Sequence, residues 1–284
     1  MLNMSISVLG ITCMNCGAPL DTRNPVYKCH YCDSKFAPLG GFASAVSGPR
    51  PDLIPKGLFE LSVGSTRYRV LGRLASGEHS RVLVARKARP VTEQVVIKVS
   101  DDLGVLEKEW ANLRDLTGRC SYLDRLLPDP VALGMARGKP ALVYRWRSGF
   151  VYNLAQVRKK FSGGVDPAAT VWMWNRILDQ LTSLRHLGYS HGAIRLEHLL
   201  VHPRDHGIAL CGWSRAACGG QEDLAASGRC IARLLGRGAP NSLCELARNA
   251  DQFDCAADLK SELKKVARAV YGPPRFRPFV LPGT

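Results

Sequence analysis

The sequence predicts an α+β protein with a small cysteine-containing module at its N-terminus and a larger domain in which strands precede helices. Two Cys-x-x-Cys pairs mark the module. Alternating apolar and polar residues with turn signals dominate residues 58–144, whereas the apolar spacing from residue 168 onward is helical. These observations divide the chain into a cysteine-containing module (1–36), a linker rich in Gly and Pro (37–57), a β-rich part (58–144), and a helical part with a tail (145–284).

The composition is that of a globular protein. The chain has 284 residues, of which 46% are hydrophobic and 22% are charged, so one substantial core and a small module are expected. No apolar run approaches the roughly 18 residues of a membrane helix, and residues 1–12 lack the basic start of a signal peptide. We therefore expect no membrane partner and a reducing, cytoplasmic location for the ten cysteines.

The net charge of +15 lies almost entirely on the larger domain. Three cations and two carboxylates leave residues 1–45 with a charge of only +1. Such an excess is typical of proteins that bind an acidic protein, nucleic acid or nucleotide phosphates. A scattered basic surface that serves only solubility explains the charge equally well.

The N-terminal module carries a set of four cysteines with metal-ligand spacing. Cys13 and Cys16 form one pair, and Cys29 and Cys32 form the second pair after twelve intervening residues. Two such pairs supply four thiolates, which is the closed tetrahedral set that structural Zn²⁺ prefers. The module resembles a zinc ribbon, and its small core implies that Zn²⁺ supplies much of its folding energy. Disulfides or free thiols are the alternatives.

Residues 191–201 read His-Gly-Ala-Ile-Arg-Leu-Glu-His-Leu-Leu-Val. This stretch resembles the catalytic loop of eukaryotic-type protein kinases, His-Arg-Asp-Leu-Lys-Pro-Glu-Asn followed by an apolar strand. In that family the aspartate accepts the proton of the substrate hydroxyl and the asparagine holds a metal ion. Ala193 and His198 stand at these two positions, and Arg195 stands where the family has a lysine.

The β-rich part resembles the phosphate-binding elements of the same family. Residues 74–82 match the glycine-rich loop with only Gly77 retained, and residues 95–99 match the strand that carries the phosphate-binding lysine, here Lys98. Glu109 falls where the family's helix supplies the carboxylate that pairs with this lysine. Tyr144 stands at the position that gates the back of the nucleotide pocket. Without the resemblance, Lys98 at a strand edge and Glu109 on a solvated helix face explain the pattern equally well.

The helical part contains two further likenesses. Residues 208–216 resemble the family's metal-binding segment, with Gly212 in place of the aspartate and Trp213 in place of the phenylalanine. Asp223 opens a pattern like the family's central helix, whose aspartate bonds the backbone of the catalytic loop. So few residues lie between Gly212 and Asp223 that the peptide-docking segment of the family is essentially absent. The resemblance also predicts an apolar stack of His191, Trp213, Leu113 and a residue of the strand 131–134.

The order of these motifs over residues 58–270 resembles a bilobal protein kinase-like domain, with a β-rich small lobe and a helical large lobe. The resemblance implies no catalytic residue and a degenerate nucleotide site formed by Gly77, Lys98, Glu109 and Arg195. Two alternatives follow for this site: weak binding of ATP that is largely independent of Mg²⁺, or a pocket that Tyr144 or Trp213 blocks. Three function classes follow, in this order of preference. They are a pseudokinase-like regulatory or scaffolding protein that binds a protein partner, an unconventional ATP-dependent phosphotransferase, and a nucleic-acid-binding protein.

Overall fold

The computed structural model describes residues 59–77, 79–88, 93–147, 149–150, 152–203, 206–218, 222–273 and 279–281, together with the backbone of three short strands near the N-terminus. The cysteines predicted to bind zinc, Cys13, Cys16, Cys29 and Cys32, lie outside the described residues.

The three N-terminal strands form an antiparallel sheet. β1 (Tyr27–Lys28) pairs with β2 (Lys35–Leu39), and β2 pairs with β3 (Phe42–Ala45). Tyr27 faces Phe36 across the first pair, and Leu39 faces Phe42 across the second. Strand pairing therefore continues to Ala45, into the segment that its glycines and prolines had marked as a linker.

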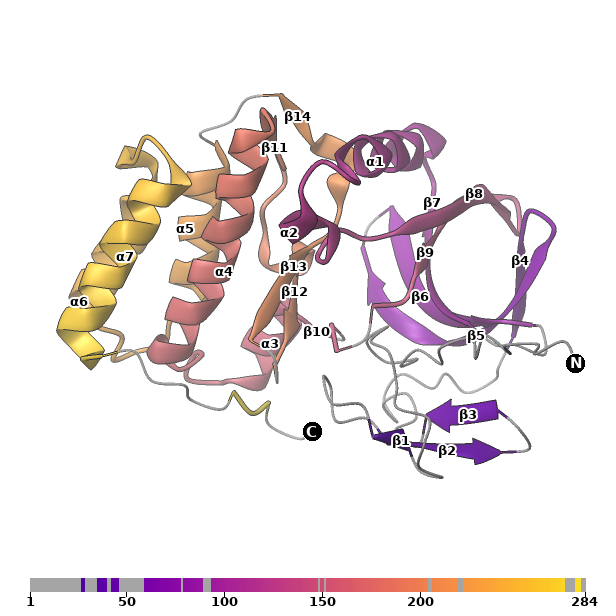
Figure 1. The fold of residues 1–284 in the computed structure, drawn as a ribbon, viewed down its shortest axis with the longest axis horizontal. Helices are drawn as coiled ribbons and strands as arrows, with labels where there is room; N and C mark the ends of the chain where they lie inside the picture. The colour runs from indigo at the N-terminus through magenta and orange to yellow at the C-terminus, as the bar shows by residue number, and fades with distance from the viewer. Residues whose placement is uncertain are drawn as a thin grey trace, which may run out of the picture.

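The small lobe is one six-stranded antiparallel sheet with the order β4-β5-β6-β7-β9-β8. Its first two strands form a hairpin, in which Val63 pairs with Thr66 across the turn at Gly64. The sheet curls strongly (Figure 1), and a Cβ added to Gly134 on β8 would lie 3.3 Å from both the Gly64 nitrogen and Val63 Cγ1. The two edges of the sheet thus approach each other around an apolar interior. The strands are β4 (Glu60–Val63), β5 (Thr66–Ser76), β6 (Ser80–Lys87), β7 (Gln94–Ser100), β8 (Pro130–Ala136) and β9 (Lys139–Arg145).

The helix α1 (Leu103–Leu116) connects β7 to the short helix α2 (Ser121–Asp124). It begins where the Asp102 side chain accepts hydrogen bonds from the backbone nitrogens of Gly104 and Val105, at 2.8 and 3.4 Å, as an N-cap should. Its buried residues, Leu106, Glu109, Leu113 and Leu116, recur at helical spacing. Three of the four are apolar, so Glu109 is the exception that needs a partner.

The large lobe is helical (Figure 1). Asp166 caps its longest helix, α4, and Pro167 opens that helix in the first turn, where proline is tolerated. Trp174 on α4 donates its indole N–H to Ser227 Oγ on α5 at 3.0 Å, and both side chains are buried. The helices are α3 (Leu154–Lys160), α4 (Pro167–His186), α5 (Glu222–Leu234), α6 (Asn241–Arg248) and α7 (Ala256–Tyr271).

Short strands frame the loop that resembles the catalytic loop. β10 (Tyr152–Asn153), β12 (Leu199–His202) and β13 (Gly207–Leu210) form one small sheet, and β11 (Tyr189–Ser190) pairs with β14 (Ala217–Cys218). The loop therefore leaves one short sheet and enters another. Among the helices described, none combines the length and apolarity needed to cross a bilayer.

Candidate functional site between the two lobes

Lys98 and Glu109 form an ion pair that connects the sheet of the small lobe to α1. Lys98 lies on β7 and Glu109 on α1, and the distance from Lys98 Nζ to Glu109 Oε2 is 2.5 Å. The side chain of Glu109 is 2% exposed and that of Lys98 is 16% exposed. Burial removes both groups from water, so each charge depends on the other for compensation. Of the two interpretations of these residues, the structure shows the paired one.

Tyr144 lies beside this pair, near the end of β9. Its ring is buried in the same apolar cluster as Leu106 and Leu113 of α1. Burial, together with the neighbouring Glu109 carboxylate, holds the pKa of Tyr144 well above its ordinary value. The phenol is therefore neutral, and its bulk fills space next to the ion pair.

Asp223 anchors the loop at residues 191–198. Its carboxylate accepts hydrogen bonds from the backbone nitrogens of His191, at 2.6 Å, and Gly192, at 3.0 Å. Asp223 is 5% exposed and lies in the first turn of α5. The loop anchor expected from the resemblance is thus present, because a carboxylate at this point satisfies two backbone donors at once.

His191 packs against Trp213. The ring centroids are 4.6 Å apart in an edge-to-face arrangement, and His191 Nε2 lies 3.2 Å from the Cys211 carbonyl oxygen. Burial, followed by the neighbouring His198, lowers the pKa of His191 to about 3. The ring is therefore neutral at physiological pH, and Nε2 donates to the carbonyl. Leu113 is fully buried in the same cluster, with Leu133 of β8 packed against it, so the side chains predicted to stack belong to one core.

The positions that carry the chemistry in the resembling family hold different groups here. Ala193 offers no proton acceptor in its side chain, and its carbonyl oxygen lies 2.8 Å from Nδ1 of His198. His198 Nε2 lies 3.1 Å from Nε and 2.9 Å from Nη2 of Arg195. Gly212 has φ +82°, and a Cβ added there would lie 2.8 Å from two atoms of the His198 ring. These four residues and the Lys98–Glu109 pair are called the interlobe site below.

The interlobe site does not fit a divalent metal of the kind that kinase-like phosphate sites use. Mg²⁺ takes oxygen ligands, chiefly carboxylates, and the only carboxylate of the site, Glu109, is paired with Lys98. Within the part of the chain that the structure describes, no three His, Cys, Asp or Glu side chains are grouped as metal ligands would be.

Two amide side chains connect the lobes by hydrogen bonds to backbone carbonyl oxygens. Gln156 on α3 donates to the carbonyl oxygen of Leu74 on β5 at 3.0 Å. Asn112 on α1 donates to the carbonyl oxygens of Trp213 and Ala216, at 2.8 and 3.1 Å. The sequence analysis did not identify either residue. The pattern Asn153-x-x-Gln156 is a capping box, as the structure confirms, and it would have located the start of α3.

Arg145, at the end of β9, and Arg147, which follows it toward the large lobe, bind groups outside the interlobe site. Arg145 pairs with Glu93 and Asp129, each at 3.3 Å. The guanidinium of Arg147 donates to the carbonyl oxygens of Arg125 and Asp124, at the end of α2. Neither cation is therefore free to act in the interlobe site.

The loop that contains Gly77 is a short connection between β5 and β6. Pairing continues to Ser76 and Arg81, and the Gly77 nitrogen donates to the Ser80 carbonyl oxygen at 2.8 Å. A Cβ added to Gly77 would meet only Ser80, at 3.6 Å or more. The glycine is thus not required by crowding within the folded chain.

The segment between Gly212 and α5 is as short as the sequence indicated. A short 3₁₀ helix (Trp213–Arg215) leads into β14, and α5 begins at Glu222. The Arg215 carbonyl oxygen passes so close to Gly192 that an added Cβ would lie 2.5 Å away. Only glycine fits at position 192, where the resembling family has an arginine.

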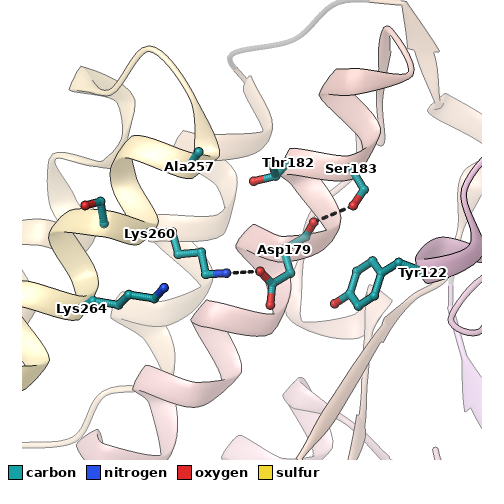
Figure 2. Close-up of a pocket in the computed structure, with 8 residues that line it drawn as sticks. Tyr122, Asp179, Thr182, Ser183, Ala257, Lys260 and Lys264 are labelled. Carbon is teal, nitrogen blue, oxygen red and sulfur yellow. Dashed lines mark hydrogen bonds and ion pairs between the residues drawn. The ribbon is translucent and has the colours of Figure 1, made fainter. Parts of the chain in front are cut away.

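A separate pocket lies in the large lobe between α2, α4 and α7 (Figure 2). Its volume is about 460 Å³. Lys260 of α7 forms an ion pair with Asp179 of α4 across it, and Ser183 donates its hydroxyl to the Asp179 carbonyl oxygen at 3.0 Å. The charges of Lys260 and Asp179 compensate each other, and their ion pair connects α7 to α4. None of the site residues predicted from the sequence lines it.

No protein-family model matches this sequence, and no curated protein sequence matches it significantly. Solved structures do match its fold. The vaccinia related kinase 3 structure is 14% identical with a TM-score of 0.58, over 81% of this chain and 96% of that chain. The BubR1 kinase domain is 12% identical with a TM-score of 0.61, over 78% of this chain and 86% of that chain.

A third structure, the PF14_0431 kinase domain, is 14% identical with a TM-score of 0.52, and the match covers 61% of this chain. This chain spans 65% of the length of that domain. At these identities the likeness concerns the fold alone. Together with the curled sheet, the Lys98–Glu109 pair and the anchored loop, it shows that the larger domain has a protein kinase-like fold.

Proposed function

We propose that this protein is a pseudokinase-like regulatory or scaffolding protein, which binds a protein partner and does not transfer phosphate. The observation that carries the proposal is the His198 ring, which fills the space where a side chain at Gly212 would begin. The fold retains the contacts that hold a kinase-like domain together, namely the Lys98–Glu109 pair and the Asp223 anchor. The groups that would perform the reaction are replaced.

We expect no efficient phosphorylation of protein substrates. Ala193 cannot accept a proton, a loss of about 10²–10⁴ in rate in enzymes that use a general base. The interlobe site also lacks free carboxylates, so the charge of a transferring phosphate would not be neutralised by metal. A radiolabel assay with Mg²⁺ and Mn²⁺ tests this. Turnover near ~1 per second, as in active kinases, would overturn the proposal in favour of an unconventional phosphotransferase. The variant Ala193→Asp restores the acceptor alone and is expected to remain inactive.

The proposed partner is an acidic protein. Arg67 and Arg69 on β5 alternate with the buried Tyr68, so they point outward from the curled sheet. Arg69 faces Arg86 across the β5–β6 ladder, and like charges in this position destabilise a sheet. Glu60 faces Arg69 from the other side and offsets part of this charge. An acidic protein surface bound to this face of the sheet would compensate the remaining positive charge of Arg69 and Arg86.

Affinity capture with the double variant Arg69→Gln, Arg86→Gln as the control tests this surface. We expect the wild-type chain to capture an acidic protein in a salt-sensitive manner and the variant to lose it. Loss of capture after nuclease treatment would instead indicate nucleic acid as the partner, the third function class. Equal capture by the wild-type chain and the variant would show that this face of the sheet does not bind the partner.

We also propose that the N-terminal module is a structural zinc ribbon. The spacing of Cys13, Cys16, Cys29 and Cys32 supports this proposal. The pairing of β1 with β2, the strands that precede and follow Cys29 and Cys32 in the sequence, is compatible with it. The thiols of Cys120, Cys211, Cys230, Cys244 and Cys255 are free, in keeping with the proposed cytoplasmic location.

Elemental analysis of the purified chain is expected to find one zinc ion per molecule. Cys13→Ser should abolish that zinc and unfold the module, because a small domain with little core depends on its metal. The unfolding transition of the larger domain should stay unchanged, because that domain has its own core. Absence of zinc, or mapping of disulfides between these cysteines, would contradict the prediction.

A further inference from the structure

The pocket between α2, α4 and α7 has the size of a small-molecule site (Figure 2). Its volume of about 460 Å³ lies within the range of ~300–1,000 Å³ that is usual for such sites. Sites for small molecules are mostly apolar, whereas polar side chains predominate here. α7 contributes Ala257, Lys260, Ser261 and Lys264, α4 contributes Asp179, Thr182 and Ser183, and α2 contributes Tyr122. A ligand that fits this pocket therefore carries polar groups of its own.

The charged side chains of the pocket leave one positive charge uncompensated. Lys260 is paired with Asp179, whose other oxygen, Oδ2, lies 3.7 Å from Nη1 of Arg176. Lys264 has no carboxylate within ion-pair distance among the described residues, and it lies one turn from Lys260 on the same face of α7. Like charges at this spacing repel each other. Two lysines and one aspartate give the lining a formal charge of +1, which one negative charge on a ligand would balance.

Two hydrogen-bond donors of the lining point toward the same space. Figure 2 shows the Lys264 side chain directed from α7 toward α4, and the Tyr122 ring directed toward the pocket from α2. The Tyr122 hydroxyl has no hydrogen-bond partner among the described residues. Burial, followed by the neighbouring Asp179 carboxylate, raises the pKa of Tyr122, so the phenol keeps its proton and can donate a hydrogen bond. The ammonium of Lys264 and this phenol are therefore available to an anionic acceptor.

Two hydroxyl groups of α4 offer acceptors. Thr182 donates to the Leu178 carbonyl oxygen at 2.8 Å, and Ser183 donates to that of Asp179 at 3.0 Å. Each hydroxyl proton is thus used within α4, while the lone pairs of the hydroxyl oxygens can still accept. The lining therefore matches a ligand that has both a charged acceptor and hydroxyl donors.

The charge of the lining favours a carboxylate over a phosphate ester. A phosphate ester carries a charge of about −1.5 to −2 at pH 7, which exceeds the formal charge of +1 on the lining. A carboxylate carries a single negative charge. The described residues that line the pocket also include no arginine, the side chain whose paired N–H donors bind phosphate in a bidentate manner.

We infer that the pocket between α2, α4 and α7 binds a small monocarboxylate that also carries hydroxyl groups, a class to which the sugar acids belong. The carboxylate accepts hydrogen bonds from Lys264 and Tyr122, and the ligand hydroxyls donate to the oxygens of Thr182 and Ser183. A ligand bound in this way connects α2, in the segment between α1 and β8, to two helices of the large lobe. The inference goes beyond the proposed function and uses none of the interlobe residues, so its test is independent of phosphate transfer.

Titration of the full chain with D-glucuronate and D-gluconate, followed by ligand-observed NMR, tests the inference. D-Glucose, propionate and glucose 6-phosphate are the comparison ligands, because they lack the carboxylate, lack the hydroxyl groups, or carry a phosphate in place of the carboxylate. We expect at least one of the two sugar acids to bind about fivefold more tightly than each comparison ligand. Binding of neither sugar acid, or equal or tighter binding of any comparison ligand, would overturn the inference.

Lys264→Gln is expected to weaken the binding of the sugar acid about fivefold, which is the effect of one exposed ion pair, and to leave glucose unaffected. Lys265→Gln is the matched control. Lys265 follows Lys264 on α7 but pairs with Glu262 and does not line the pocket, so its substitution should change neither ligand. Equal affinity of the sugar acid for the wild-type chain and Lys264→Gln would overturn the inference.

Tyr122→Phe tests the phenol separately. It removes the hydroxyl and keeps the ring, so without ligand the variant should unfold at the wild-type temperature. Binding of the sugar acid should weaken about tenfold, because a hydrogen bond from a half-buried phenol to a charged acceptor is lost. An unchanged affinity would contradict the role assigned to Tyr122.

Thermal unfolding gives a second readout of the same site. A ligand that binds only the folded chain stabilises it, so a fixed concentration of the sugar acid should raise the unfolding temperature of the wild-type chain more than that of Lys264→Gln or Tyr122→Phe. A rise of the same size in the wild-type chain and both variants would contradict binding in this pocket.

Discussion

Glu109→Ala is expected to destabilise the larger domain by about 3 kcal/mol, because loss of one member of a buried ion pair leaves the other charge uncompensated. The carboxylate of Glu109 is 2% exposed and lies 2.5 Å from Lys98 Nζ. Lys98 remains 16% exposed, so water can partly solvate its charge after the substitution. We therefore expect a loss of stability at the lower end of the range for buried ion pairs. Urea denaturation followed by tryptophan fluorescence measures it, and Trp110 lies next to the substituted position.

Two further variants separate the ion pair from general damage to α1. Lys98→Met combined with Glu109→Leu should recover most of the lost stability, because no buried charge remains. Glu262→Ala removes one member of the Glu262–Lys265 pair on the surface of α7 and should cost less than about 0.5 kcal/mol. If Glu109→Ala is as mild as Glu262→Ala, the pair does not contribute to stability as described.

Asp223→Ala is expected to cost a similar amount, about 3 kcal/mol, because it leaves the backbone nitrogens of His191 and Gly192 without their acceptor. An unsatisfied buried donor costs about 1–3 kcal/mol, and Asp223 accepts from two of them at 2.6 and 3.0 Å. Denaturation measures the total effect. Hydrogen exchange is more specific, and the amides of His191 and Gly192 should lose their protection.

Asp223→Asn and Asp251→Asn complete this experiment. Asn keeps one oxygen acceptor but directs an N–H₂ group toward the other backbone donor, so an intermediate loss is expected. Asp251 is exposed on the large lobe, and Asp251→Asn should leave both the stability and the two amides unchanged. Retained protection of His191 and Gly192 in Asp223→Ala would mean that other contacts hold the loop.

The loop anchor and the ion pair were both predictable from the sequence, for a shared reason. Each joins elements whose type follows from local periodicity, such as the strand that carries Lys98 and the helix that carries Glu109. Once the order of elements resembles a known fold, the positions of these residues within their elements follow. The sequence left open whether Glu109 faces solvent, and the structure places it on the apolar face of α1 with Leu106 and Leu113.

The contacts made by loops and side-chain amides were not predictable in this way. The bonds from Gln156 to Leu74 and from Asn112 to Trp213 join residues that are distant in sequence and carry no distinctive motif. The direction of Arg147, away from the interlobe site and toward the end of α2, likewise depends on where the α2 carbonyl groups lie. A single amide or guanidinium is compatible with many partners until the backbone is placed.

The sequence by itself determined the order of strands and helices, and it showed that Ala193, His198 and Gly212 replace the groups that transfer phosphate in the resembling family. Only the tertiary structure decided what these replacements do together. His198 and Gly212 lie fourteen positions apart in the sequence. The backbone at Gly212 is left-handed, and a Cβ added to it would lie against the imidazole of His198. This arrangement depends on the backbone angle φ at Gly212. The replacements at positions 198 and 212 are therefore packed together, and Arg195 donates hydrogen bonds to the same imidazole.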